Sequence, residues 1–150
     1  MKEFVVKAID NGTVIDHIPS ESVFNVIRIL NLDTFGNQIL FGTNLESAKL
    51  GLKGIIKVKN KYFEKDEINK IALFAPKATL IKIKDYQIIE KTTVSLPEKI
   101  EAIVKCFNPN CITNTENITT KFAVIDKIEV KLLCHYCEKI TDKENFIISK

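Results

Sequence analysis

The segment CFNPNC, residues 106–111, has a cysteine at each end and the turn formers Asn108, Pro109 and Asn110 between them. A second cysteine pair follows in CHYC, residues 134–137. Each short loop can bring two thiolates to one side of a metal, and two such loops close a tetrahedron with Zn–S distances of about 2.3 Å. We therefore predict one structural Zn²⁺ with four thiolate ligands: Cys106, Cys111, Cys134 and Cys137.

Four sulfur ligands leave no open coordination position for water or substrate, so the predicted site is structural rather than catalytic. Metal binding can supply an apparent free energy of about 10–16 kcal/mol to the folding of a short segment. The alternatives are a redox pair at Cys134 and Cys137 or four unrelated thiols. His135 lies between two predicted ligands, but at that spacing the flanking sulfurs reach the metal more easily.

A change of character near TTVSLPEKI, residues 92–100, indicates a boundary between two parts of the chain. Pro97 cannot donate a hydrogen bond to a strand ladder, so it ends the strand that precedes it. We expect a domain over 1–94, a linker over 95–100 and a metal-binding domain over 101–150. Short apolar runs in the last part predict the strands of a small zinc ribbon-like β domain near 101–106, 121–126, 128–134 and 144–149.

The part before this boundary alternates strand-like and helix-like segments. EFVVKAI is rich in β-branched residues and ends at the turn signal Asn11-Gly12, and Pro19 favours the start of a helix. The predicted order is a strand at 3–9, a helix from Pro19, strands at 37–43 and 53–63, a helix at 64–75, and one long or two short strands over 78–91.

This order is that of an α+β, ferredoxin-like fold, in which two helices cover one face of an antiparallel sheet. On the third strand, Lys57 and Lys59 alternate with apolar residues, so the other face of the sheet should carry these lysines. Helical spacing predicts that the first helix buries four apolar side chains: Val23, Phe24, Ile27 and Leu30.

The charge of the chain argues weakly against a nucleic-acid partner. The formal net charge is +3, and among the 22 lysines and arginines only Arg28 is an arginine, whose planar fork suits base and phosphate recognition. The chain has no tryptophan, and we expect most of its nine phenylalanines at core positions rather than exposed for base stacking. A zinc-ribbon nucleic-acid-binding accessory factor is nevertheless the alternative interpretation.

Several other functional classes lack their sequence signals. No run approaches the roughly 20 apolar residues of a membrane helix, and the N-terminus lacks the pattern of a signal peptide, so we expect a cytoplasmic protein with no membrane partner. The sequence contains no GxGxxG, GxxxxGK[ST], GxSxG or HExxH motif. With every cysteine assigned to zinc and only two histidines present, we predict no catalytic residues.

The dipeptide Asp16-His17 in GTVIDHIP, residues 12–19, could be a catalytic pair, a ligand-binding pair or a polar turn between a strand and a helix. The residue types by themselves favour the polar turn.

Five motifs in the same order resemble the regulatory chain family of aspartate carbamoyltransferase: GTVIDHIP, IALFAPKAT, SLPEKI, NPNC and CHYCEK. The resemblance covers essentially the whole chain. It implies a non-catalytic regulatory subunit in pyrimidine biosynthesis, whose N-terminal domain binds ATP and CTP, with UTP as a further candidate, and pairs with a second regulatory chain. It also implies that the zinc domain docks to a catalytic chain.

The same resemblance assigns roles to individual residues. His17 would lie near phosphate and Asp16 near the ribose hydroxyls, while Lys57 and Lys91 would meet the phosphates and ribose. The other residues implied at the nucleotide would enclose the base: Ala8, Ile9, Val14, Ile83, Tyr86 and Ile88. The surface for the catalytic chain would include three residues beside the metal loops: Asn108, Asn110 and Glu138.

Overall fold

The computed structural model describes residues 8–48 and 51–149 of the chain, which divides into two compact units, Met1–Ser95 and Leu96–Lys150. Each unit has its own antiparallel sheets and its own buried residues. Among the described residues, every helix is too short or too polar to cross a bilayer.

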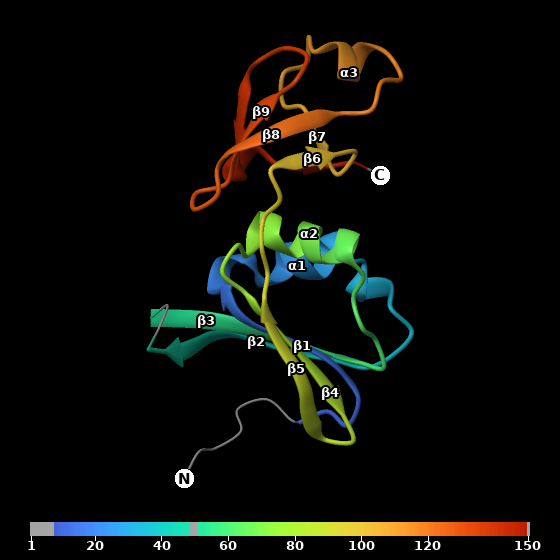
Figure 1. The fold of residues 1–150 in the computed structure, drawn as a ribbon, viewed down its shortest axis with the longest axis vertical. Coiled ribbons are helices and arrows are strands. Elements are labelled where there is room, and N and C mark those ends of the chain that lie inside the picture. Colours follow the sequence, from blue (N-terminus) through green and yellow to red (C-terminus); the bar gives the residue numbers. More distant parts are fainter. Residues whose placement is uncertain (1–7, 49–50, 150) are drawn as a thin grey trace. The chain divides into compact units, whose positions relative to one another are not determined.

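The first unit is a five-stranded antiparallel sheet with two helices on one face, which confirms the predicted ferredoxin-like fold (Figure 1). The strands lie in the order β2-β3-β1-β4-β5, in which the last strand extends the usual four-stranded arrangement. Its strands and α-helices are β1 (Gly12–Pro19), α1 (Val23–Ile29), β2 (Ile39–Ser47), β3 (Gly51–Lys59), α2 (Lys65–Phe74), β4 (Thr79–Lys84) and β5 (Gln87–Thr93).

The position of the first strand differs from the prediction. Most of the predicted strand at 3–9 lies outside the described residues, but Ala8 and Ile9 are not in a strand, and β1 follows the Asn11-Gly12 turn instead of preceding it. The polar turn that the residue types alone favour at Asp16-His17 is therefore not formed, because both residues lie inside β1. They form a β-bulge there, since the register with β3 shifts between Ile15 and Ile18 and His17 has a φ of 58°.

The core of the first unit lies between the sheet and the helices. Ile15 on β1 and its cross-strand partner Ile56 on β3 are both 0% exposed. The helix α2 buries Ile71 and begins with a capping box between Glu64 and Glu67, and its first turn carries acidic residues. The predicted stripe on α1 is correct except for Phe24, whose side chain is 52% exposed.

Close contact between β3 and α1 requires a glycine at position 54. A Cβ built on Gly54 would overlap the side chain of Val23, the first residue of α1. We expect Gly54→Ala to lower the free energy of unfolding of this unit by about 1–3 kcal/mol, the usual cost of overpacking a filled core. Urea unfolding measures this change, and Gly36→Ala is the matched control because a Cβ at Gly36 meets nothing within 4 Å. Equal stabilities for the two variants would contradict the prediction.

The second unit is built from short strands, as expected for a small metal-dependent β domain. A four-stranded antiparallel sheet has the order β10-β9-β8-β6, and β11 pairs with β7. The elements are β6 (Lys99–Glu101), β7 (Val104–Lys105), α3 (Ile112–Thr115), β8 (Lys121–Asp126), β9 (Lys131–Cys134), β10 (Ile140–Asp142) and β11 (Ile147–Ile148). The strand predicted at 121–126 is confirmed, whereas β10 was not predicted.

The expectation that most phenylalanines occupy core positions is wrong. Among the described residues, Phe63, Phe74 and Phe122 are buried, but Phe24, Phe41 and Phe107 are each more than 40% exposed. Composition alone cannot separate these two groups, because a half-buried strand and a surface loop both accept aromatic residues.

Candidate functional site

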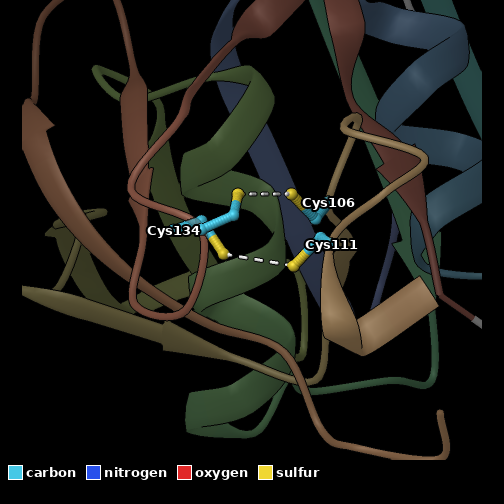
Figure 2. A group of neighbouring side chains, drawn as sticks. Cys106, Cys111 and Cys134 are labelled. Carbon is cyan, nitrogen blue, oxygen red and sulfur yellow. Dashed lines mark hydrogen bonds between the residues drawn. The ribbon is translucent and has the colours of Figure 1, made fainter. Parts of the chain in front are cut away.

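The four cysteine thiols of the second unit gather in one place. Their Sγ atoms all lie within 4.8 Å of one another, and three of the four side chains are buried. Cys106 and Cys111 extend from the first loop toward Cys134 at the end of β9 (Figure 2). The two short loops therefore converge from opposite sides, as the spacing in the sequence predicts.

The separations between the sulfur atoms fit a tetrahedral zinc ion. The Sγ atoms of Cys106 and Cys137 are 3.6 Å apart, and those of Cys111 and Cys134 are 3.7 Å apart. A tetrahedron with Zn–S distances of about 2.3 Å has edges of about 3.8 Å. Four converging thiols with this spacing are the donor set of one structural zinc, and they leave no coordination position for a substrate.

The metal-free thiols differ in acidity. Burial, with smaller contributions from neighbouring thiols, raises the pKa of Cys106 to about 12. Burial also raises the pKa of Cys137. Hydrogen bonds from the Asn108 side chain and the Lys139 amide outweigh this effect and lower the pKa to about 7. Because thiolates bind zinc and thiols do not, metal affinity should decrease as the pH falls.

His135 is not part of this cluster, in agreement with the sequence analysis. Its side chain is exposed and stacks edge-on against Tyr136, with 5.0 Å between the ring centroids. Together with Glu138, His135 lines a hollow of about 380 Å³ beside the sheet. The hollow also carries both signs of charge on neighbouring strands, from Lys99, Glu101 and Lys121.

The two asparagines predicted at the partner surface lie in the first cysteine loop. Asn108 Oδ1 accepts a hydrogen bond from the Asn110 amide at 3.1 Å, and the Asn108 carbonyl accepts one from the Cys111 amide at 3.0 Å. Asn110 is exposed and Asn108 is half-buried. The loop thus presents an amide side chain from a backbone that is already fixed.

A second candidate site lies on the face of the five-stranded sheet that the helices leave uncovered. Cross-strand pairing places Lys57, Val14, Ile81 and Lys91 in one row across β3, β1, β4 and β5. Because paired residues point to the same face, the two lysines flank an apolar centre. Their backbones are three strand spacings, or about 14 Å, apart. An elongated ligand with an apolar middle could fill this space.

The apolar centre of this face is a cluster of Ile9, Val14 and Ile83, against which Ile81 and other half-buried side chains pack. Ile88 pairs with Ile83 and so shares its face, although it is 62% exposed. All three clustered residues were implied at the base by the resemblance.

The hairpin turn between β4 and β5 lies against the segment before β1. The Tyr86 amide donates to the Asp10 carbonyl at 2.9 Å, and the Asp85 amide donates to Asn11 Oδ1 at 3.1 Å. The Tyr86 side chain is 71% exposed, and Ala8 is also exposed. Backbone groups of both segments therefore border the apolar cluster, while these two side chains stay open to solvent.

Asp16 and His17 occupy the end of β1 on the same sheet. Asp16 Oδ1 accepts hydrogen bonds from the His17 amide at 2.7 Å and from Lys53 Nζ at 2.8 Å. His17 Nδ1 lies 3.1 Å from the Thr79 hydroxyl. Lys53 was not among the predicted site residues, yet the alternation of Lys53, Ile55 and Lys57 along β3 places both lysines on one face.

Lys57 is not the solvated strand lysine that such a position usually holds, because it is only 9% exposed. Burial lowers the pKa of Lys57, and the charge of Asp16 offsets part of this effect. A bound anion on this face would favour the charged ammonium in the same way as Asp16 does.

The pKa of Asp16 predicts an acid-dependent loss of stability. Burial by itself would raise this pKa, but the hydrogen bonds from Lys53 and the His17 amide, with the charges of both side chains, lower it below 3.8. Ionised Asp16 therefore stabilises the folded state above the unfolded-state pKa, and this contribution is lost as the pH falls through the folded-state value. We expect Asp16→Asn to destabilise the unit at pH 7 but to match the unsubstituted chain in strong acid.

Urea unfolding at several pH values, followed through the amide signals of β1, measures this difference. Asp33→Asn is the control, since Asp33 is exposed. A stability gap between Asp16→Asn and the unsubstituted chain that stays constant down to strong acid would contradict the assignment.

Comparison with known proteins yields two family models and a set of full-length relatives. Residues 4–95 match the model described as the allosteric domain of the aspartate carbamoyltransferase regulatory chain, and residues 98–147 match that of the metal-binding domain of the same chain. A curated aspartate carbamoyltransferase regulatory chain from Thermococcus sibiricus is 52% identical over 148 residues, covering 99% of this chain and 97% of the relative. The corresponding chain of Parabacteroides distasonis is 49% identical over 147 residues, covering 98% and 96%.

Proposed function

Because this chain belongs to the family of aspartate carbamoyltransferase regulatory chains, and is thus a non-catalytic subunit with an allosteric and a metal-binding domain, we propose that it transmits a nucleotide signal to a catalytic chain. The domain before the boundary at 95–100 binds ATP and CTP at one pocket, and the zinc domain after it docks to the catalytic chain. The family match does not favour the alternative of a nucleic-acid-binding accessory factor.

The uncovered face of the five-stranded sheet supports the nucleotide site. Its apolar cluster of Ile9, Val14 and Ile83 suits a base, and lysines on either side suit a polyphosphate. Asp16 offers a carboxylate to ribose hydroxyls, and His17 and Lys91 offer further contacts. The fact that carries this proposal is the burial of Lys57 beside an apolar centre, since such a cation gains most from an anionic ligand.

Adenine and cytosine differ in the order of hydrogen-bond donors and acceptors along their edges. The backbone near Ile9 and the turn at Tyr86 are fixed to each other by the bond from the Tyr86 amide to Asp10. Backbone amides and carbonyls held in fixed positions beside the base can therefore distinguish adenine from cytosine by hydrogen bonding, without a dedicated side chain. ATP and CTP, with UTP as a further candidate, compete for this one pocket in our proposal.

Regulation requires that a nucleotide prefer one of two states of the assembled enzyme, because a ligand that binds both equally shifts nothing. ATP and CTP would therefore favour opposite states although they share a pocket. The four reduced thiols of the metal site fit a reducing compartment, and we place the protein in the cytoplasm.

Docking to the catalytic chain uses the rigid surface around the metal loops. Asn108 and Asn110 lie on a hydrogen-bonded loop, and Glu138, next to Cys137, lines the charged hollow beside the sheet. A loop that the metal has already fixed loses little conformational entropy when a partner binds, so its polar groups contribute more of their energy to affinity.

Pairing with a second copy is proposed at the β2 edge of the five-stranded sheet. Phe24 and Phe41 contact each other there at 5.5 Å between ring centroids, and with Leu52 they are 44–52% exposed. An exposed edge strand beside apolar side chains is a surface that a protein usually covers. Phe41→Glu should shift the isolated chain from dimer to monomer in analytical ultracentrifugation, and an unchanged mass would remove this edge from the proposal.

The proposed function is tested by mixing the zinc-loaded chain with the catalytic subunit from the same organism. We expect a larger complex by mass measurement, and an aspartate saturation curve that ATP and CTP shift in opposite directions. Absence of a complex in zinc would end the docking proposal. A complex whose aspartate response ignores saturating nucleotide would end the effector proposal alone.

A further inference from the structure

One asparagine beyond the first cysteine loop makes an unusual number of contacts with it. Asn114 lies on the short helix α3, and its Nδ2 donates to the carbonyl of Cys106 at 2.8 Å and to the carbonyl of Asn108 at 2.7 Å. Its backbone amide donates to the Cys111 carbonyl at 2.8 Å. Three hydrogen bonds from one residue thus reach the first, third and last residues of CFNPNC.

These bonds account for both donor hydrogens of the side-chain amide. They bring the Cys106 and Asn108 carbonyls to one nitrogen, although the negative ends of two such dipoles would repel each other without a shared donor. The Asn108 carbonyl also accepts a hydrogen bond from the Cys111 amide at 3.0 Å. The turn is therefore held both by a hydrogen bond within the loop and by the hydrogen bonds from Asn114.

We propose that Asn114 is a positioning residue for the metal centre, which holds the first cysteine loop in the shape that lets Cys106 and Cys111 bind the ion together. The directions of these two side chains follow from the backbone that Asn114 fixes. A loop that keeps this shape without metal loses less conformational entropy when the ion binds, and it reopens less often once the ion is in place.

Asn108 is itself braced within this turn. Its carbonyl accepts from Asn114 and from the Cys111 amide, and its Oδ1 accepts from the Asn110 amide. The contacts of Asn114 therefore reach the backbone of two of the four cysteines, both in the first loop. This inference depends on the metal-binding domain and not on the proposed nucleotide pocket or docking surface, so it fails or holds independently of them.

The test uses the full chain loaded with one zinc, and measures the rate of zinc release to a chromophoric chelator and the zinc affinity by competition. Removing a residue that orients metal ligands from outside typically lowers metal affinity about 10–100-fold. We expect Asn114→Ala to weaken zinc affinity by that factor, mostly through faster release. Asn117→Ala is the matched control, because Asn117 is an exposed asparagine three residues further along.

Two further measurements separate positioning from a general loss of fold. Asn114→Asp keeps the size of the side chain and adds a negative charge that by itself attracts Zn²⁺, but it removes both Nδ2 donors; we expect faster release than from the unsubstituted chain. Substitution with Co²⁺ gives absorption bands that report four-sulfur tetrahedral geometry. We expect these bands to shift in Asn114→Ala and to stay unchanged in Asn117→Ala, while amide spectra of the zinc-loaded forms show intact sheets.

The proposal predicts at least a tenfold loss of zinc affinity. It would be overturned if both Asn114 variants kept a zinc affinity and a release rate within about twofold of the Asn117→Ala control. If zinc-loaded Asn114→Ala does not fold, Asn114→Ser, which keeps one donor, decides the question. A release rate between those of the unsubstituted chain and Asn114→Asp supports the positioning role, and an unchanged rate overturns it.

Discussion

Removal of zinc from this chain should unfold the Leu96–Lys150 unit and leave the Met1–Ser95 unit folded. The second unit consists of short strands, and its cysteines join loops that lie far apart in sequence. A segment of this length is only marginally stable on its apolar core alone, and structural zinc contributes an apparent free energy of about 10–16 kcal/mol. The first unit has a five-stranded sheet with two helices and no part in the cluster of four thiols.

Amide correlation spectra of the full chain with and without a strong chelator measure this result. We expect the signals of β8 and β9 to collapse into the unfolded range, and those of β1 and β3 to stay dispersed. Adding zinc back should restore the spectrum. Persistence of the β8 and β9 signals in metal-free protein would show that the unit folds without its metal.

Two adjacent substitutions provide a matched pair for the same experiment. Cys134→Ser removes one of the four clustered thiols, so it should reproduce the chelator result even in excess zinc. His135→Ala changes the next residue, which is exposed and lies outside the cluster, and should behave as the unsubstituted chain does. Loss of zinc from His135→Ala would make the histidine a ligand and contradict the assignment.

The metal site could be predicted from the sequence because its information is local. Two short loops with turn formers constrain where their thiols point, and any compact fold that brings the loops together then completes the site. The order of strands and helices in the first unit was predictable for a similar reason, since periodicity and turn signals act over a few residues. Individual side-chain contacts were harder to predict, as Asn114 and Lys53 show.

Asn114 carries no recognisable motif, and its importance appears only when its side chain is seen between two carbonyls of the cysteine loop. Lys53 pairs with Asp16 at the irregular register between β1 and β3, and a β-bulge leaves no clear sequence signal. The first strand was misplaced because the turn signal at Asn11-Gly12 marks a boundary without telling on which side the strand lies. For Lys53 the missing information was the pairing between strands, and for Asn114 it was the conformation of the loop that its side chain contacts.

Lys57→Gln should weaken the binding of ATP and CTP to the isolated chain by roughly 10- to 100-fold, since a hydrogen bond to a charged group contributes about 1.5–3 kcal/mol. Glutamine keeps most of the length of the side chain and its packing beside Val14, but it removes the positive charge. The same substitution should change the affinity for the uncharged nucleosides far less, because they lack the phosphates that the lysine attracts.

Isothermal titration of the zinc-loaded chain with each nucleotide and each nucleoside measures both effects. Lys84→Gln is the matched control, because Lys84 is exposed on the same sheet but, three residues along β4 from Ile81, points to the opposite face. Raising the salt concentration should reduce this loss only slightly, since a buried charge is screened much less than an exposed one. Equal losses for Lys57→Gln and Lys84→Gln would mean that general surface charge attracts the nucleotide, and the uncovered sheet face would then not be its binding site.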